Sequence, residues 1–300
     1  MPTSKPPLPP LPIYALHDAL QTLGGAASTQ DQQHIKAIHR HLSHRLVLEG
    51  GLPSHWVAPR PPYVTKKGPN NTHHRLQYSA AAEDLAERKI YGGIKIKDLD
   101  VSVIADYVGP VIGISAKSTG NAFRNLTNRM EEALGECSNV HMMYPGFVFG
   151  FLHLIKQCPL GEYDKPNASF DATGRLPMSC LTRYHDVLVS LSGRTSTIDP
   201  AMRYEAVGLI VYQCRNGVTT ICPDYPPPHS PVHYSSFFNR LYNIYDIRFA
   251  YPDSDGKTNY RKFWSVKGHE APEEVDGQTG FPWAPRIEGI PEEATEEGLA

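Results

Sequence analysis

Residues 94–131 read IKIKDLDVSVIADYVGPVIGISAKSTGNAFRNLTNRME, and two periodicities follow one another within them. A β-rich run ends at the turn-forming residues around Gly109, and a second β-rich run, VIGISAKS, follows it. After Gly120, apolar residues recur at steps of three and four, as they do along an amphipathic helix. These residues are Phe123, Leu126, Met130 and Leu134. The stretch therefore predicts a β-hairpin followed by a helix.

The hairpin register predicts which acid lies near the lysine. If the turn is centred on Gly109, facing residues have numbers that sum to about 217 or 218. Lys117 then lies beside residue 100 or 101, whereas Asp106 faces the start of the second strand. Asp98 falls beyond the last paired residue. Asp100 is therefore the aspartate expected to share a site with Lys117.

The helix offers a second carboxylate. At 100° per residue, Glu131 lies about 80° from Phe123, on the shoulder of the apolar stripe. Glu132 lies about 180° away and is expected to face water. A side chain on the shoulder of a packed helix can reach over the edge of the sheet. Glu131 is therefore the candidate.

Asp100, Ser115, Lys117 and Glu131 together resemble the active site of the PD-(D/E)XK nuclease superfamily. The resemblance is closest to type II restriction endonucleases in which Ser-x-Lys stands where most members have an acid. In that subgroup the following helix supplies the acid. The match covers residues 75–156, and it departs from the family pattern in having Leu99 where a proline usually stands.

The resemblance implies both a fold and a reaction. The fold is an α/β, restriction-endonuclease-like core, with a mixed central sheet flanked by helices and with N- and C-terminal additions. Asp100 and Glu131 would hold Mg²⁺, which prefers oxygen ligands and keeps several waters. Lys117 would orient the attacking water and offset charge in the transition state. Ser115 would reach the ion only through a water.

These features predict a type II restriction endonuclease, which hydrolyses phosphodiester bonds in double-stranded DNA at a specific short sequence with Mg²⁺. A homodimer or tetramer is expected, because one site cuts one strand. Two alternatives stay open: a non-catalytic DNA-binding protein with a nuclease-like fold, and a nuclease acting on modified DNA. The sequence has no phosphate-binding loop, dinucleotide fingerprint, nucleophile elbow or H-E-x-x-H pair.

Composition divides the chain into four parts. They are a proline-rich start and helical region (1–70), the nuclease core (71–160), a remainder of the same domain for DNA recognition or dimerisation (161–268), and an acidic flexible tail (269–300). The net charge is −2, but residues 268–300 hold nine acids and one base. The preceding part therefore carries +6, which suits a polyanion-binding protein.

Two helices ahead of the hairpin carry further candidate residues. The predicted helix Gln30–Leu48 holds four histidines, which we interpret as part of a solvated basic helix rather than as a metal site; they are His34, His39, His41 and His44. The predicted helix Ser79–Lys89 holds Glu83 and Glu87. Either of these acids would join the site if the helix ahead of the hairpin contributes one, as it does in some superfamily members. A solvated helix face is the competing interpretation.

Cysteine usage and hydropathy indicate a cytoplasmic protein. The five cysteines are scattered and form no C-x-x-C pair, which argues against a disulfide framework or a zinc ribbon. No apolar run approaches the roughly 18 residues that span a bilayer. We therefore expect no membrane association.

Overall fold

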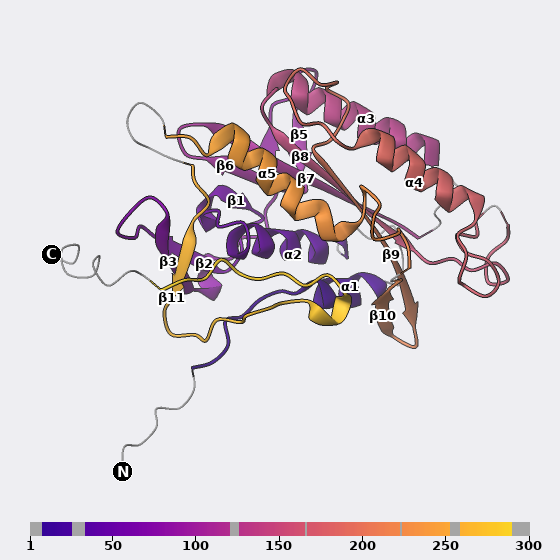
Figure 1. Cartoon of the computed structure of the whole chain (residues 1–300), viewed down its shortest axis with the longest axis horizontal. Coiled ribbons are helices and arrows are strands. Elements are labelled where there is room, and N and C mark those ends of the chain that lie inside the picture. Colours follow the sequence, from indigo (N-terminus) through magenta and orange to yellow (C-terminus); the bar gives the residue numbers. More distant parts are fainter. Residues whose placement is uncertain are drawn as a thin grey trace, which may run out of the picture.

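The computed structural model describes residues 8–25, 34–120, 126–165, 167–222, 224–252 and 259–289, and its centre is a six-stranded mixed sheet (Figure 1). In sheet order the strands are β1 (Val57–Ala58), β6 (Val101–Ala105), β7 (Gly109–Thr119), β8 (Val148–Lys156), β9 (Ala206–Arg215) and β10 (Val218–Ile221). The β1–β6–β7 pairs are antiparallel, the β7–β8–β9 pairs are parallel, and β10 is antiparallel to β9. The predicted α/β class with a mixed central sheet is confirmed.

Helices cover both faces of the sheet. They are α1 (Leu16–Gly24), α2 (Ile35–Leu48), α3 (Leu126–Met143), α4 (Ser179–Leu191) and α5 (Phe237–Phe249). Figure 1 shows α3 and α4 above the strands and α1 and α2 below them. Along β8, Leu152 and Leu154 join the core under α1, α2 and α5, whereas Phe149 and Phe151 join the core under α3 and α4. This alternation is that of a strand buried on both faces.

The predicted hairpin exists as β6–β7, but its predicted register is wrong. Val101 pairs with Ile114, so facing numbers sum to 215 at the open end of the hairpin. The chain turns at Tyr107, which has a φ of 68°, and not at Gly109. A register shift between Val103 and Ile104 displaces the pairs further. The order of strand, strand, helix and strand along β6, β7, α3 and β8 is as predicted.

The predicted helix over Ser79–Lys89 is wrong. Only a short 3₁₀ turn, η2 (Ala80–Ala82), forms there, and β4 (Arg88–Ile90) pairs with β5 (Lys97–Leu99). The backbones of Asp84 and Arg60 form two hydrogen bonds: the Arg60 N–H donates to the Asp84 carbonyl at 2.6 Å, and the Asp84 N–H donates to the Arg60 carbonyl at 3.0 Å. These bonds occupy groups that a helix would have used internally.

Helix α2 confirms the described part of the predicted helix Gln30–Leu48, but the helix is not solvated. His39, His41 and His44 are all buried. Each of the three rings has at least one nitrogen within hydrogen-bond distance of another group of the protein; His44 Nδ1, for example, lies 3.0 Å from Tyr63 Oη. Burial lowers the pKa of His41 to about 4 and that of His44 to about 3, so both rings are neutral at pH 7. In the part of the chain that the structure describes, no helix is both long and apolar enough to cross a bilayer.

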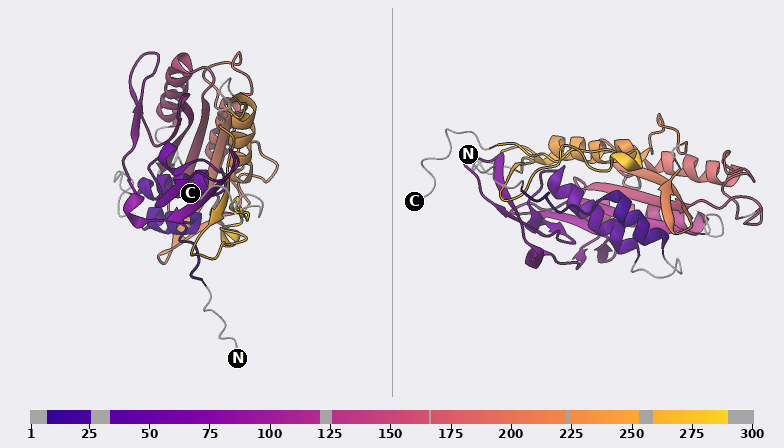
Figure 2. Two further views of the ribbon diagram at one scale, coloured as in Figure 1. Left: turned by 90° about the vertical axis from the view of Figure 1, so that its left-hand side faces the viewer. Right: turned by 90° about the horizontal axis from the view of Figure 1, so that it is seen from below.

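The segment after the last strand packs on the body of the protein. A second sheet has the order β11 (Phe263–Val266), β3 (His73–Tyr78), β2 (Tyr63–Lys66). Beyond it, Trp283 is buried and donates Nε1–H to Asp276 Oδ2 at 2.8 Å. Figure 2 shows this yellow segment running along the molecule, and its turn η4 (Gly277–Thr279) contacts α1. The predicted flexible tail is therefore wrong for 269–289, and 290–300 lie outside the described residues.

One buried ion-pair network links Glu205, just before β9, to Arg194 and to Arg248 of α5. Glu205 is 2% exposed and its Oε1 accepts hydrogen bonds from Arg194 at 2.5 Å and Arg248 at 2.8 Å. Its Oε2 accepts a hydrogen bond from the backbone N–H of Phe149 at 2.8 Å.

The two remaining 3₁₀ turns of the described chain are η1 (Ser54–Trp56) and η3 (Tyr234–Ser236).

Candidate active site

An unpaired stretch of strand β7 forms the base of the candidate site. The last pair between β6 and β7 joins Val101 to Ile114, and from there to Thr119 β7 is paired only with β8 among the described strands. Ser115 and Lys117 therefore lie on a strand edge that β6 leaves uncovered. Asp100 immediately precedes β6, so its side chain lies at the same edge.

Asp100 collects three hydrogen bonds on one oxygen. Its Oδ2 accepts from Lys117 Nζ at 2.9 Å, from the Ala116 backbone N–H at 2.8 Å and from Ser115 Oγ at 3.3 Å. Burial favours the neutral carboxyl, but the charge of Lys117 leads the effects that outweigh it and lower the pKa of Asp100. Asp100 is therefore ionised at neutral pH. The predicted pairing of Asp100 with Lys117 is confirmed, although the register behind that prediction was wrong.

Lys117 is held as an ammonium group. Burial opposes its charge, but the carboxylates of Asp100 and Glu136 outweigh burial and raise the pKa of Lys117. Its side chain retains 24% exposure, so the amine lies between the buried cluster and solvent. An amine in this position can donate to a water or an anionic oxygen at the surface of the cluster.

Glu136, and not Glu131, is the acid that α3 brings to the cluster. Glu136 is 6% exposed. Its Oε2 lies 3.1 Å from Ser115 Oγ, whose single hydroxyl proton it shares with Asp100, and its Oε1 lies 3.1 Å from Lys97 Nζ. Burial raises the pKa of Glu136, and Lys117 and Lys97 lower it in part. Glu131 is exposed. It lies five residues before Glu136, so its side chain points about 140° away from that of Glu136 around the helix axis.

The helix phase explains the misplacement of Glu131. The predicted stripe was centred on Phe123, which lies outside the described residues, and included Leu134, which is only partly buried. The residues of α3 that are buried are Met130, Ala133, Glu136, Cys137, Asn139, Val140 and His141. This face is rotated by roughly 50° from the predicted one. The small and apolar residues Ala133, Cys137 and Val140 were the signal that would have placed Glu136 beside the sheet.

A histidine and a further acid also lie near Asp100. One ring nitrogen of His39, one carboxylate oxygen of Glu87 and one of Asp100 all lie within 4.8 Å of one another. His39 Nδ1 and Glu87 Oε1 are 3.3 Å apart. Of the two acids expected ahead of the hairpin, Glu87 is thus near the cluster, whereas Glu83 pairs with Arg40 at 2.7 Å. The interpretation of His39 as a solvated residue is wrong.

None of the known protein families, curated proteins or solved structures compared with this chain matches it. What the cluster can do is therefore argued from its own geometry. It combines a buried carboxylate (Glu136), a partly buried one (Asp100), a hydroxyl that contacts both, and an ammonium group beside them. Oxygen donors of this kind suit a hard divalent cation.

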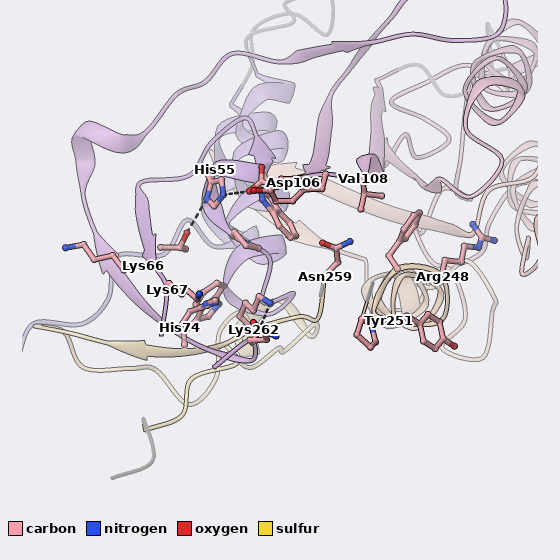
Figure 3. Close-up of a pocket in the computed structure, with 18 residues that line it drawn as sticks. His55, Lys66, Lys67, His74, Asp106, Val108, Arg248, Tyr251, Asn259 and Lys262 are labelled. Atoms are coloured by element: carbon pink, nitrogen blue, oxygen red, sulfur yellow. Dashed lines mark hydrogen bonds and ion pairs between the residues drawn. The ribbon is translucent and has the colours of Figure 1, made fainter. Parts of the chain in front are cut away.

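A cavity of about 690 Å³ lies at the opposite end of the hairpin (Figure 3). Asp106 lines it, and six residues of extended chain separate Asp106 from Asp100 by roughly 20 Å. Figure 3 shows Lys66, Lys67 and Lys262 around one side of this cavity. Burial lowers the pKa of Lys262 to about 8. The cavity is thus a basic and aromatic pocket, separate from the cluster of Asp100 and Glu136.

Proposed function

We propose that this chain is a Mg²⁺-dependent endonuclease that hydrolyses phosphodiester bonds in double-stranded DNA at a specific short sequence. The observation that carries the proposal is the contact set of Ser115, whose hydroxyl lies within hydrogen-bond distance of both Asp100 and Glu136. Both carboxylates are thereby within reach of one hydrated cation, with Lys117 beside them. The chain order of β6, β7, α3 and β8 agrees with the nuclease resemblance of the sequence.

The donor set fits magnesium. Carboxylate oxygens are its preferred protein ligands, and an ion held by two carboxylates keeps water in its remaining positions. When bound, the ion would lower the pKa of a coordinated water and stabilise charge on the scissile phosphate. Asp100 and Glu136 would hold it, in place of the pair Asp100 and Glu131 expected from the sequence.

The protein residues have separate tasks in this proposal. Asp100 is fixed by the Ala116 N–H, so its position does not depend on the cation. Lys117 holds its proton and would donate it in a hydrogen bond to the attacking water or to a phosphate oxygen, offsetting negative charge as the bond breaks. Ser115 contributes no charge, and its hydroxyl keeps the two carboxylates at a fixed spacing.

Double-stranded DNA as substrate is supported by charge. The chain before residue 268 carries +6, and the packed segment 268–289 lowers this to +2. The positive charge that remains is partly local, because Lys66 and Lys67 lie beside the cavity of Figure 3. Phosphate contacts of this kind position a duplex without reading its sequence. One cluster per chain cuts one strand, so a double-strand break requires a homodimer or tetramer with two clusters facing opposite strands.

The test is cleavage of supercoiled plasmid and defined duplexes by purified protein with Mg²⁺, followed by sequencing of the ends. We expect cuts at one short site, abolished by excess EDTA and restored by added Mg²⁺. Light scattering with and without DNA measures the oligomeric state. Full cleavage in EDTA would refute the metal site. DNA binding without cleavage under every divalent cation would favour the non-catalytic alternative.

A further inference from the structure

His39, Glu87 and Asp100 form a second group of possible metal ligands, which shares Asp100 with the cluster on β7. They come from α2, from the chain ahead of β4, and from the start of β6. Their three nearest ligand atoms lie within 4.8 Å of one another. Two ligand atoms on opposite sides of a divalent transition-metal ion are about 4.2 Å apart, so the group needs to contract by well under an ångström.

The state of His39 is compatible with a bound ion, and its Nδ1 is the ring nitrogen that lies 3.3 Å from Glu87 Oε1. The side chain is 3% exposed, and its Nε2 is buried with no hydrogen-bond partner among the described residues. A buried polar atom without a partner costs folding free energy that a bound ligand can recover. Asp100 has acceptor capacity left for the same purpose, because all its hydrogen bonds within the described chain go to Oδ2.

The three ligands are held by separate contacts. Arg88, next to Glu87, donates to the backbone oxygens of His55 and Trp56, each at 3.0 Å. The same segment is tied to α2 by the ion pair between Glu83 and Arg40. These contacts fix the loop that carries Glu87 against the helix that carries His39, as a ligand group formed before its ion requires.

We propose that His39, Glu87 and Asp100 bind a second divalent cation, and that this site prefers a first-row transition ion such as Mn²⁺ over Mg²⁺. The reason for the preference is the imidazole, a nitrogen donor that suits transition ions, whereas Mg²⁺ favours oxygen. Three protein ligands leave positions for water or a phosphate oxygen. The inference rests on the proposed function in that Asp100 serves both ions, and it gives that enzyme two cations of different preference.

Mn²⁺ added to the purified protein is the probe. Electron paramagnetic resonance counts bound ions, and its pulsed form detects nitrogen bonded to the manganese. We expect two bound Mn²⁺ per chain and a signal from one imidazole nitrogen, which a tenfold excess of Mg²⁺ leaves in place. His39→Gln is expected to remove the nitrogen signal and one bound ion. Glu87→Gln is expected to weaken that ion at least tenfold, because even indirect partners of metal ligands change affinity by about 10–100-fold.

Glu131→Gln is the matched control, because it makes the same change at an exposed acid that is absent from the group of His39. It is expected to keep both ions. Glu87 has a side chain that is 28% exposed, so its variant tests the site even if His39→Gln unfolds. A wild-type protein with no nitrogen signal, or a signal that survives His39→Gln, overturns the inference.

The two proposals fail separately in these experiments. Glu136→Gln is expected to lose the other ion and to keep the nitrogen signal, because Glu136 is absent from the group of His39. A nitrogen signal in a protein that cuts no DNA supports the second site and refutes the nuclease. Cleavage with Mg²⁺ by a protein that never shows the nitrogen signal supports the nuclease and refutes the second site.

Discussion

Replacing Glu136 by glutamine changes charge and keeps volume, so it separates what this carboxylate does for stability from what it does for catalysis. Without divalent cations the side chain has a cost, because burial raises the pKa of Glu136. The unfolded chain loses this proton first as pH rises, so the carboxylate subtracts stability above its unfolded pKa, near 4.5. Glu136→Gln removes this loss. We expect the metal-free variant to be at least as stable as wild type at pH 7.

With a divalent cation bound, the wild type is expected to be more stable than Glu136→Gln. A ligand present at 100 times its Kd stabilises the folded state by about 2.7 kcal/mol, which raises the Tm of a chain of this size by roughly 5 °C. Glu136→Gln is expected to lose most of that rise. Its cleavage rate is expected to fall by about 10²–10³-fold, the usual effect of removing one preorganised group from a charged transition state.

Thermal unfolding without Mg²⁺ and at Mg²⁺ concentrations raised in tenfold steps measures the change in Tm. Single-turnover plasmid cleavage measures the change in cleavage rate. Glu131→Gln is the matched control on the same helix, because its side chain is exposed. It is expected to stay within about twofold of wild type in cleavage. An inactive Glu131→Gln beside an active Glu136→Gln would refute the helix phase and the site built on it.

Three further substitutions test the cluster and its scaffold. Lys117→Ala is expected to lower cleavage by about 10²–10³-fold and to leave duplex affinity in Ca²⁺ within a few-fold, measured by fluorescence anisotropy; a large loss of affinity would contradict its role at the reacting water. Glu205→Ala is expected to cost about 3–5 kcal/mol at pH 7 in urea unfolding, because it leaves the buried Arg194 and the partly buried Arg248 without their carboxylate. Burial raises the pKa of Glu205, but the bonds it accepts outweigh burial and lower it, so its contribution is complete above the unfolded pKa and is lost as pH falls through the folded one. An unchanged difference between wild type and variant at low pH would count against this ion pair. Gly113→Ala places a methyl group 2.6 Å from Phe147 Cζ and is expected to cost about 1–3 kcal/mol, measured by urea unfolding; a neutral effect would show that the ring moves freely.

Features with a local cause were predictable from the sequence. The β-rich composition of the runs that form β6 and β7 and the three- and four-residue steps after Gly120 indicated a hairpin and a helix, and both are present. The register was not predictable, because the hairpin turns at Tyr107, a residue with no turn preference, while Gly109, which resembled the centre of the turn, already pairs with Ala105. Asp100 still meets Lys117, because a lysine side chain spans the error of two to three residues.

The ligands that come from other elements were not predictable. Glu136 depends on how α3 rolls on the sheet, and the apolar residues near the helix start gave a phase about 50° away from the buried one. His39 and Glu87 meet Asp100 only after α2 and the chain ahead of β4 close over the hairpin. A histidine-rich helix with arginines reads as a surface helix unless its tertiary partners are known.

The choice of serine at position 115 follows from the charges around it. Ser115 is fully buried, and its hydroxyl contacts Asp100 at 3.3 Å and Glu136 at 3.1 Å. A carboxylate at this position would add a third negative charge to a buried site in which Lys117 and Lys97 already offset two. Burying a further unpaired charge is costly, so once α3 supplies Glu136, the strand position is compatible with a neutral donor and not with an acid. The Ser-x-Lys spacing on β7 and the acid on α3 are thus two consequences of one charge balance.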